Sequence, residues 1–307
     1  MTEKVEILLA TYNGEQYLRE QLESILSQDY DNWIIRVCDD ASSDSTYNIL
    51  KEYQGQYPHK FILTKNRVRF GSAKKNFMQL IRSSTCDYVM CCDQDDVWLP
   101  NKISVTINEM KKNEQEDMPV LVHTDLKVVD SNLQVLSESF FEHSNFRKEF
   151  KLHDILIQNF VTGCTMMMNR PMVTLMSRVV DCDNILMHDW VASVLATSTG
   201  KVAFVDMPTM LYRQHAINSV GAKKYGFVLF VSKLKDAKMK QSLVNTMMQA
   251  SVIADLYQDI LDKDKYQFIH QYGTLWEKNK FQRIRFYLKY RVLKKGFPRK
   301  VCQLIVG

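Results

Sequence analysis

The chain has 307 residues, of which 46% are hydrophobic and 24% are charged, the proportions of an ordinary globular protein. No apolar run approaches the ~20 residues that a membrane-spanning helix needs, and residues 1–4 lack the pattern of a secretory signal. Seven cysteines, an odd number without the spacing of metal ligands, indicate buried free thiols in a reducing cytoplasm rather than a zinc site.

The net charge of +5 is unevenly distributed along the chain. Residues 223–307 contain 18 Lys and Arg and 6 Asp and Glu, a net charge of +12. The first 222 residues contain 22 basic and 29 acidic side chains, a net charge of −7. A basic segment that follows an acidic body indicates a location or a partner rather than a catalytic role.

The first part of the chain alternates predicted strands with predicted helices. Hydrophobic periodicity predicts strands at 5–10, 33–38, 61–64 and 88–92, and helices at 15–27, 46–53, 72–81 and 99–112. This alternation predicts an α/β fold of Rossmann-like type, with a mixed, mainly parallel sheet and helices on both faces. In such sheets ligands bind beyond the carboxyl ends of the strands, where Thr11, Asp39, Asp40 and Asp93 stand.

The second part is less regular. The sequence predicts strands at 120–129, 161–168 and 202–206, and helices at 151–157, 171–180 and 189–199. The polar residues 131–149 are interpreted as a mobile flap, and residues 225–292 as helical throughout, with a break near 262–264. We therefore expect a main domain over 1–220 and a basic helical C-terminal extension over 221–307.

The most informative segment is Cys-Cys-Asp-Gln-Asp-Asp-Val-Trp at 91–98, where an apolar strand ends in three carboxylates. Because isolated carboxylates are costly to bury, stability does not explain them. Strand alternation puts Asp93 and Asp95 on one side, where they suit a hard divalent cation that also holds a phosphate. A calcium loop is excluded because its twelfth position is Ser104 rather than Glu, whereas a solvated turn stays as the alternative.

Six segments, in order, resemble motifs of the family 2 glycosyltransferases, which have the GT-A fold. The segments are Thr11–Leu18, Asp39–Thr46, Asn66 with Gly71 and Lys74–Phe77, Asp93–Trp98, His188–Trp190, and Tyr212–His215 with Asn218. The match covers about residues 4–220, and two of the motifs have forms often met in bacterial rhamnosyltransferases. The resemblance implies metal-dependent, inverting sugar transfer, with a nucleotide-sugar half over about 1–115 and an acceptor half over about 116–220.

The resemblance also implies roles for individual residues. Asp189 would be the general base, and the nucleotide-sugar would be bound by Thr11, Tyr12, Asp39, Asp40, Lys74, Asp93 and Arg213. The metal, Mn²⁺ or Mg²⁺, would be held by Asp93, Asp95 and His215. Structural alternatives stay open: a turn carboxylate for Asp40, a solvated Lys74, a helix N-cap for Asp189, a secondary or capping role for Asp96, and an orienting role for His188.

The basic extension carries a further pattern. Phe281, Ile284, Leu288 and Val292 form one helical stripe with basic residues interleaved. A basic amphipathic helix of this kind predicts peripheral contact with an anionic membrane, and packing on the main domain is the alternative. The helices expected over 225–262 are candidates for homo-oligomer contacts, and no segment resembles a nucleic-acid-binding motif.

The resemblance implies a nucleotide-sugar donor, with dTDP-rhamnose as the first expectation and a UDP-hexose or UDP-N-acetylhexosamine as the second. The expected acceptor is a cell-surface polysaccharide or a lipid-linked glycan, modified in the cytoplasm at the inner face of the bacterial plasma membrane. A nucleotidyltransferase is disfavoured because residues 11–15 do not supply a glycine-rich phosphate loop. A non-catalytic protein of the same fold that binds nucleotide or glycan is the remaining alternative.

Overall fold

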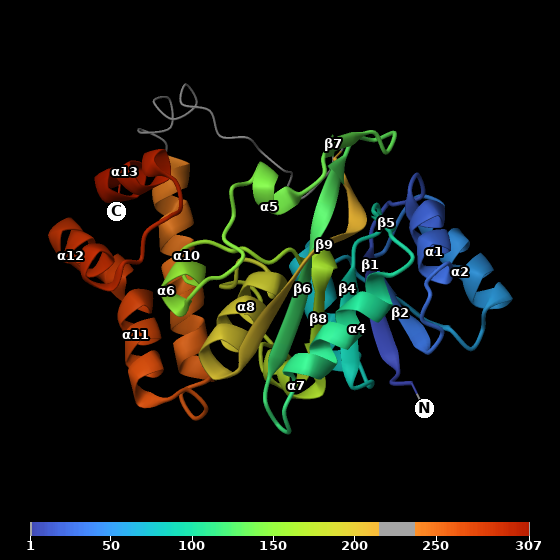
Figure 1. Cartoon of the computed structure of the whole chain (residues 1–307), viewed down its shortest axis with the longest axis horizontal. Coiled ribbons are helices and arrows are strands. Elements are labelled where there is room, and N and C mark those ends of the chain that lie inside the picture. Colours follow the sequence, from blue (N-terminus) through green and yellow to red (C-terminus); the bar gives the residue numbers. More distant parts are fainter. Residues whose placement is uncertain (1, 215–236, 307) are drawn as a thin grey trace.

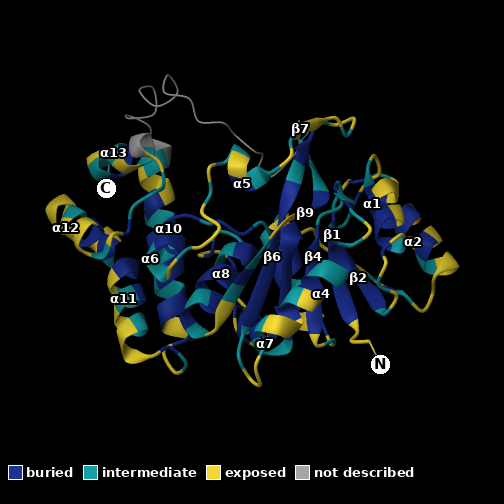
Figure 2. Ribbon diagram, viewed as in Figure 1, coloured by how far each residue is buried: buried dark blue, intermediate teal, exposed yellow. Residues whose placement is uncertain are grey.

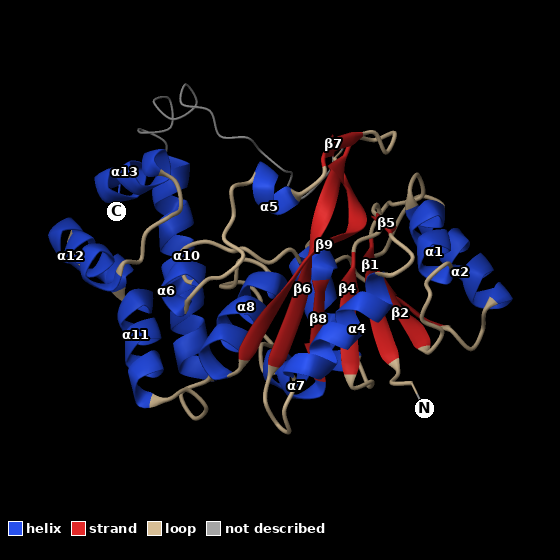
Figure 3. Ribbon diagram, in the orientation of Figure 1, coloured by secondary structure: helices blue, strands red, loops and turns tan. Residues whose placement is uncertain are grey.

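The computed structural model describes residues 2–214 and 237–306, and a nine-stranded sheet forms its centre (Figures 1 and 3). The sheet order is β3-β2-β1-β4-β8-β6-β9-β5, and β7 pairs with β6. The strands are β1 (Val5–Thr11), β2 (Trp33–Asp39), β3 (Phe61–Lys65), β4 (Tyr88–Cys92), β5 (Val97–Trp98), β6 (Val120–Val129), β7 (Val135–Ser137), β8 (Met166–Asn169) and β9 (Lys201–Arg213).

Most strands run in one direction. The pairs β1–β2, β2–β3, β1–β4 and β6–β9 are parallel, whereas β8 is antiparallel to both β4 and β6. The mixed, mainly parallel sheet expected from the sequence is therefore confirmed. Its parallel strands bring the carboxyl ends of β1, β2 and β4 to one edge, where ligands bind in open α/β sheets.

Helices cover both faces of the sheet (Figure 1). One face is covered by α1 (Leu18–Leu26), α2 (Thr46–Gln56) and α4 (Lys102–Asn113), and the other by α3 (Ala73–Ser83), α7 (Arg170–Ser177) and α8 (His188–Thr199). A hydrophobic core lies on each face: the first core is under α1, α2 and α4, and the second core is under α3, α7 and α8. Because successive strand residues point to opposite faces, Ile7 and Leu9 pack in the first core and Leu8 in the second. In Figure 2 the central strands are largely coloured as buried.

The C-terminal helices share the second core with the sheet-covering helices. They are α10 (Ala237–Leu256), α11 (Lys263–Gly273), α12 (Lys280–Tyr290) and α13 (Phe297–Val306), with the short 3-10 turn η2 (Leu275–Glu277). Tyr257 Oη donates to the carbonyl of Leu175 at 2.7 Å, and Gln249 Oε1 accepts from the N–H of Leu186 at 2.8 Å. The extension is therefore packed on α7 and on the segment that leads into α8. Across the described ranges, none of the helices is both long enough and apolar enough to cross a bilayer.

Several elements differ from the sequence-based expectation. The strand expected at 202–206 continues to Arg213. Pro208 does not end it, because this proline stands at a register shift between β6 and β9, where a missing N–H costs no regular ladder bond. The strand expected over 161–168 is confined to β8, and the segment 131–149 contains β7 and the short helix α5 (Phe140–His143). The predicted helix break is confirmed by Asp262, which caps α11, whereas α13 was not predicted and 225–236 lies outside the described residues.

Candidate active site

Five chain segments meet at the carboxyl edge of the sheet. Thr11 ends β1, Asp39 ends β2, and Asp93 follows β4 directly. The 3-10 turn η1 (Gly163–Thr165) and the first turn of α8, which carries Asp189, complete this edge. The structure thus brings predicted residues from both halves of the main domain to one place.

Asp39 and Asp40 are buried and are bonded to the surrounding backbone and side chains. Thr11 Oγ1 and the N–H of Ser42 donate to the two oxygens of Asp39, at 3.1 and 3.0 Å. Asp40 accepts from the N–H groups of Phe70 and Gly71, at 2.7 and 2.9 Å. Asp40 therefore binds backbone N–H groups, as its structural alternative supposed, but they belong to the loop after β3 rather than to its own turn. Its contact with a nucleotide-sugar stays a prediction.

Tyr12 is fixed by a residue whose role was not predicted from the sequence. The side-chain amide of Gln94 accepts from the N–H of Tyr12 at 2.8 Å and donates to its carbonyl at 2.9 Å. The guanidinium of Arg69 lies 3.8 Å from the centre of the Tyr12 ring. The middle residue of the Asp-Gln-Asp motif thus joins the loop after β4 to the loop after β1.

Gly14 leaves the space that this amide pair needs, and we expect Gly14→Ala to break the pair. A Cβ at position 14 would lie 2.3 Å from Gln94 Oε1, so the Gln94 side chain must move and lose both hydrogen bonds. The expected cost is about 1–3 kcal/mol in the free energy of unfolding, measured by urea titration, together with weaker nucleotide binding.

Gly55→Ala is the matched control, because a Cβ there has no neighbouring atom within 4 Å. In α2 this control is expected to stabilise the protein by about 0.5–1 kcal/mol. Equal stabilisation by both substitutions would contradict the role assigned to the Gln94 amide.

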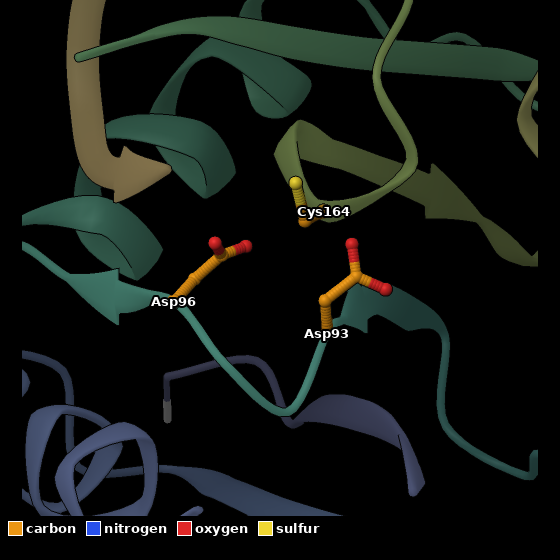
Figure 4. A group of neighbouring side chains, drawn as sticks. All are labelled: Asp93, Asp96 and Cys164. Carbon is orange, nitrogen blue, oxygen red and sulfur yellow. The ribbon is translucent and has the colours of Figure 1, made fainter. Parts of the chain in front are cut away.

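Asp93, Asp96 and Cys164 each offer a ligand atom, and these atoms lie within 4.8 Å of one another (Figure 4). Burial, together with the negative charges of Asp95 and Asp189, raises the pKa of Asp93 to about 7. Burial also raises the pKa values of Asp96 and Cys164 well above their ordinary range. The sequence did not predict Cys164 here, because it comes from a turn that only the sheet order brings beside β4.

Asp96 anchors the Asp93–Trp98 loop to the end of β9. Its Oδ1 accepts from the N–H of Arg213 at 3.1 Å, and its buried Oδ2 has no hydrogen-bond partner in the part of the chain that is described. The N-cap of α4 is Asn101, so the capping alternative for Asp96 is wrong.

Arg213 and Lys74 have other contacts than those predicted. The buried Arg213 donates to the carbonyl of Asp95 at 2.8 Å, to that of Ser131 at 2.7 Å, and pairs with Glu20. Lys74 donates to the carbonyl of Ile185 in the segment before α8. Arg213 thus holds the loop that contains Asp95, and Lys74 holds the segment before α8. Contact with a nucleotide-sugar stays a prediction for both residues. His215 lies outside the described residues.

Asp189 is buried in the first turn of α8. Its Oδ2 accepts from the N–H of Gly163 at 3.0 Å, and its Oδ1 has no hydrogen-bond partner within ranges 2–214 and 237–306. Burial raises the pKa of Asp189 to about 7, against the opposing effect of the N–H groups of Trp190 and Gly163. The N-cap of α8 is Met187, so the capping alternative for Asp189 is wrong.

His188 packs beside Asp189 without a hydrogen bond to it. Its ring stacks on Phe77 with centroids 4.3 Å apart, and burial lowers its pKa to about 3, so the imidazole is neutral. Neither ring nitrogen bonds to another described residue. A Cβ at Gly163 would lie 2.8 Å from His188 Nε2, which explains why this turn has glycine. Any orienting effect of His188 on Asp189 therefore acts through packing.

The acidic loop after β4 fits a hard divalent cation. Mg²⁺ and Mn²⁺ prefer oxygen ligands, which the carboxylates of Asp93 and Asp95 provide, whereas the thiol of Cys164 suits softer metals. Burial and like charges keep the pKa of Asp93 high, and a cation between these carboxylates would relieve both effects. That Asp93 and Asp95 hold the ion stays a prediction, because the ligand atoms that the structure brings together are those of Asp93, Asp96 and Cys164.

Comparison with known proteins gives a consistent result. The family model described as glycosyl transferase family 2 matches residues 6–174. The dTDP-rhamnosyl transferase RfbG of Shigella flexneri is 30% identical over 275 residues, which cover 81% of this chain and 90% of that protein.

Two solved structures show the same fold at low sequence identity. The crystal structure of S. aureus TarS 1-349 aligns with a TM-score of 0.59 and 13% identity, over 90% of this chain and 92% of that one. The mannosyltransferase PcManGT from Pyrobaculum calidifontis, in complex with GDP-Man and Mn²⁺, aligns with a TM-score of 0.55 and 15% identity, over 100% of this chain and 85% of that one. The GT-A fold expected from the sequence motifs is confirmed.

Proposed function

The chain belongs to glycosyl transferase family 2, and from this premise we propose that it transfers L-rhamnose from dTDP-rhamnose to a glycan hydroxyl. The sugar is supported by the likeness to RfbG over most of both chains. Inverting sugar transfer is supported above all by the buried carboxylate of Asp189 at the carboxyl edge of the sheet. This carboxylate lies close enough to Asp93 for its charge to raise the pKa of Asp93.

The proposed mechanism gives each group of residues one step. Asp189 accepts the proton of the acceptor hydroxyl. At the same time the hydroxyl oxygen of the acceptor forms a bond to the anomeric carbon, and the bond from that carbon to the diphosphate breaks. Attack from the side opposite the leaving group inverts the configuration of that carbon. Asp93 and Asp95 would hold Mn²⁺ or Mg²⁺, and the bound ion would supply positive charge to the leaving diphosphate. The Tyr12 and Asp39 loops form the wall of the nucleoside site.

The proposed acceptor is a lipid-linked glycan that is extended in the cytoplasm, at the inner face of the bacterial plasma membrane. Such a glycan is held at the bilayer surface, so the enzyme must present its acceptor side there. The excess of Lys and Arg in residues 223–307 supports this location, because cytoplasmic leaflets carry anionic lipids.

The test is metal-dependent release of nucleoside diphosphate from a panel of donors: dTDP-rhamnose, UDP-glucose, UDP-galactose and UDP-N-acetylglucosamine. We expect release from dTDP-rhamnose with Mn²⁺ or Mg²⁺, and increased release when a lipid-linked glycan is added. Release from a UDP-sugar but not from dTDP-rhamnose would contradict the proposed donor and leave the proposed enzyme class unchanged. If calorimetry detected no nucleotide binding and no donor were cleaved, the alternative of a non-catalytic protein would replace the proposal.

A further inference from the structure

The outward face of α12 exposes large apolar side chains next to basic ones. Phe281 is 76% exposed and Leu288 is 55% exposed, and Trp276 in η2, just before this helix, is 48% exposed. Arg285 and Lys289 are also exposed. Positions 281, 285, 288 and 289 recur at the helical period, so they share one face. We call Trp276, Phe281, Arg285, Leu288 and Lys289 the docking face.

The opposite face of α12 attaches the helix to the protein. Phe286 and Tyr287 are buried in the core that α10 and α11 also line. Asn279 and Gln282 form a capping box at the start of the helix. The stripe predicted from the sequence is therefore divided, because Val292 is buried whereas Phe281 and Leu288 face outward. Folding does not account for the exposed apolar residues, since the helix is held by its other face.

Charge identifies what this face can contact. After Glu277 the sequence contains ten Lys and Arg and no Asp or Glu, whereas the first 222 residues have a net charge of −7. An anionic surface attracts only the C-terminal end of such a molecule. Aromatic and leucine side chains beside Lys and Arg suit a bilayer interface, where the apolar groups enter and the charged groups stay at the lipid headgroups.

A second copy of the chain fits this face less well. A two-fold contact would place the same patch on both partners, so it would bring together two copies each of Arg285 and Lys289 with no acidic residue of the docking face to pair with them. We propose that the docking face binds the surface of an anionic lipid bilayer. This inference goes beyond the sugar transfer, because it rests on exposure and charge at the end of the molecule formed by α10 to α13 (Figure 2).

The experiment is flotation of the full chain with vesicles of phosphatidylcholine, with and without 30% phosphatidylglycerol. We expect the wild type to float with the anionic vesicles, to remain behind with pure phosphatidylcholine, and to lose binding as salt is raised. The double variant Arg285→Gln/Lys289→Gln is expected to bind roughly tenfold more weakly. Phe281→Ser/Leu288→Ser is expected to lower binding to a similar degree, because it removes the apolar side chains that enter the interface.

Matched controls lie on the main domain. Val180→Ser removes an apolar side chain that is 74% exposed, and Lys4→Gln removes an exposed charge, so both are expected to bind like the wild type. All variants change exposed residues, so their thermal unfolding should match that of the wild type.

Two results would overturn the proposal. One is a wild type that does not float with anionic vesicles, and the other is undiminished flotation of both docking-face variants. A wild-type dimer in light scattering that both variants convert to monomer, without vesicle binding, would instead identify the face as a contact between copies. Because donor cleavage is measured separately, failure of vesicle binding leaves the proposed sugar transfer standing and removes only the support for its location at the membrane.

Discussion

Asp189→Asn is expected to lower kcat by about 10²- to 10⁴-fold while the affinity for nucleoside diphosphate stays nearly unchanged. Asparagine keeps the size of the side chain and can still accept from the N–H of Gly163, but it cannot take a proton from an acceptor hydroxyl. Steady-state kinetics with acceptor, together with calorimetry of nucleotide binding, separate the two quantities.

The pH dependence gives a second readout of the same residue. Since burial raises the pKa of Asp189 to about 7, the carboxyl group is protonated below that pH and cannot act as a base. We therefore expect kcat/KM, which reports the ionisation of the free enzyme, to rise with pH up to about 7 and then to level off. The rise should be absent from the residual activity of Asp189→Asn.

Asp183→Asn is the matched control, because Asp183 lies in the same segment but is exposed and paired with Lys75 at 2.8 Å. It should leave kcat and the pH profile unchanged. If Asp189→Asn kept kcat at saturating donor but bound nucleoside diphosphate much more weakly, Asp189 would belong to the donor site rather than to the acceptor site.

The sequence predicted the edge of the sheet well because buried parallel strands are apolar and end abruptly in polar residues. Thr11, Asp39 and Asp93 stand at three such ends, and parallel pairing brings those ends together. Local periodicity was sufficient here. It failed for β5, which has two residues and exists only through its pairing with β9.

Contacts between distant parts of the chain were not predictable from local pattern. Gln94 bonds to Tyr12 across 82 residues, and Arg213 bonds to Asp95 across 118. Gln94 and Arg213 stand in the recognised motifs, so the motifs identified the segments but not what each side chain holds. The sequence predicted Arg213 as a nucleotide-sugar contact, which stays untested, but it could not show which carbonyl oxygens surround the buried guanidinium.

Asp95→Ala is expected to lower metal-dependent kcat/KM by about 10²- to 10³-fold, because it removes one of the two carboxylates that would hold the ion against the diphosphate. The change leaves the backbone carbonyl of Asp95, which Arg213 uses, in place. The loop should therefore keep its position. Donor hydrolysis over a Mn²⁺ titration, with dTDP affinity measured with and without Mn²⁺, shows whether the loss follows the metal.

Asp96→Asn and Cys164→Ser distinguish this placement of the ion from the deeper cluster that Asp96 and Cys164 form with Asp93. In Asp96→Asn the side-chain oxygen can still accept from the N–H of Arg213, so its anchoring contact survives. If the ion is bound by Asp93 and Asp95, both substitutions change the apparent metal affinity less than Asp95→Ala does. Losses as large as that of Asp95→Ala would mean that the ion binds in the deeper cluster, where a thiol ligand favours a softer metal than Mg²⁺.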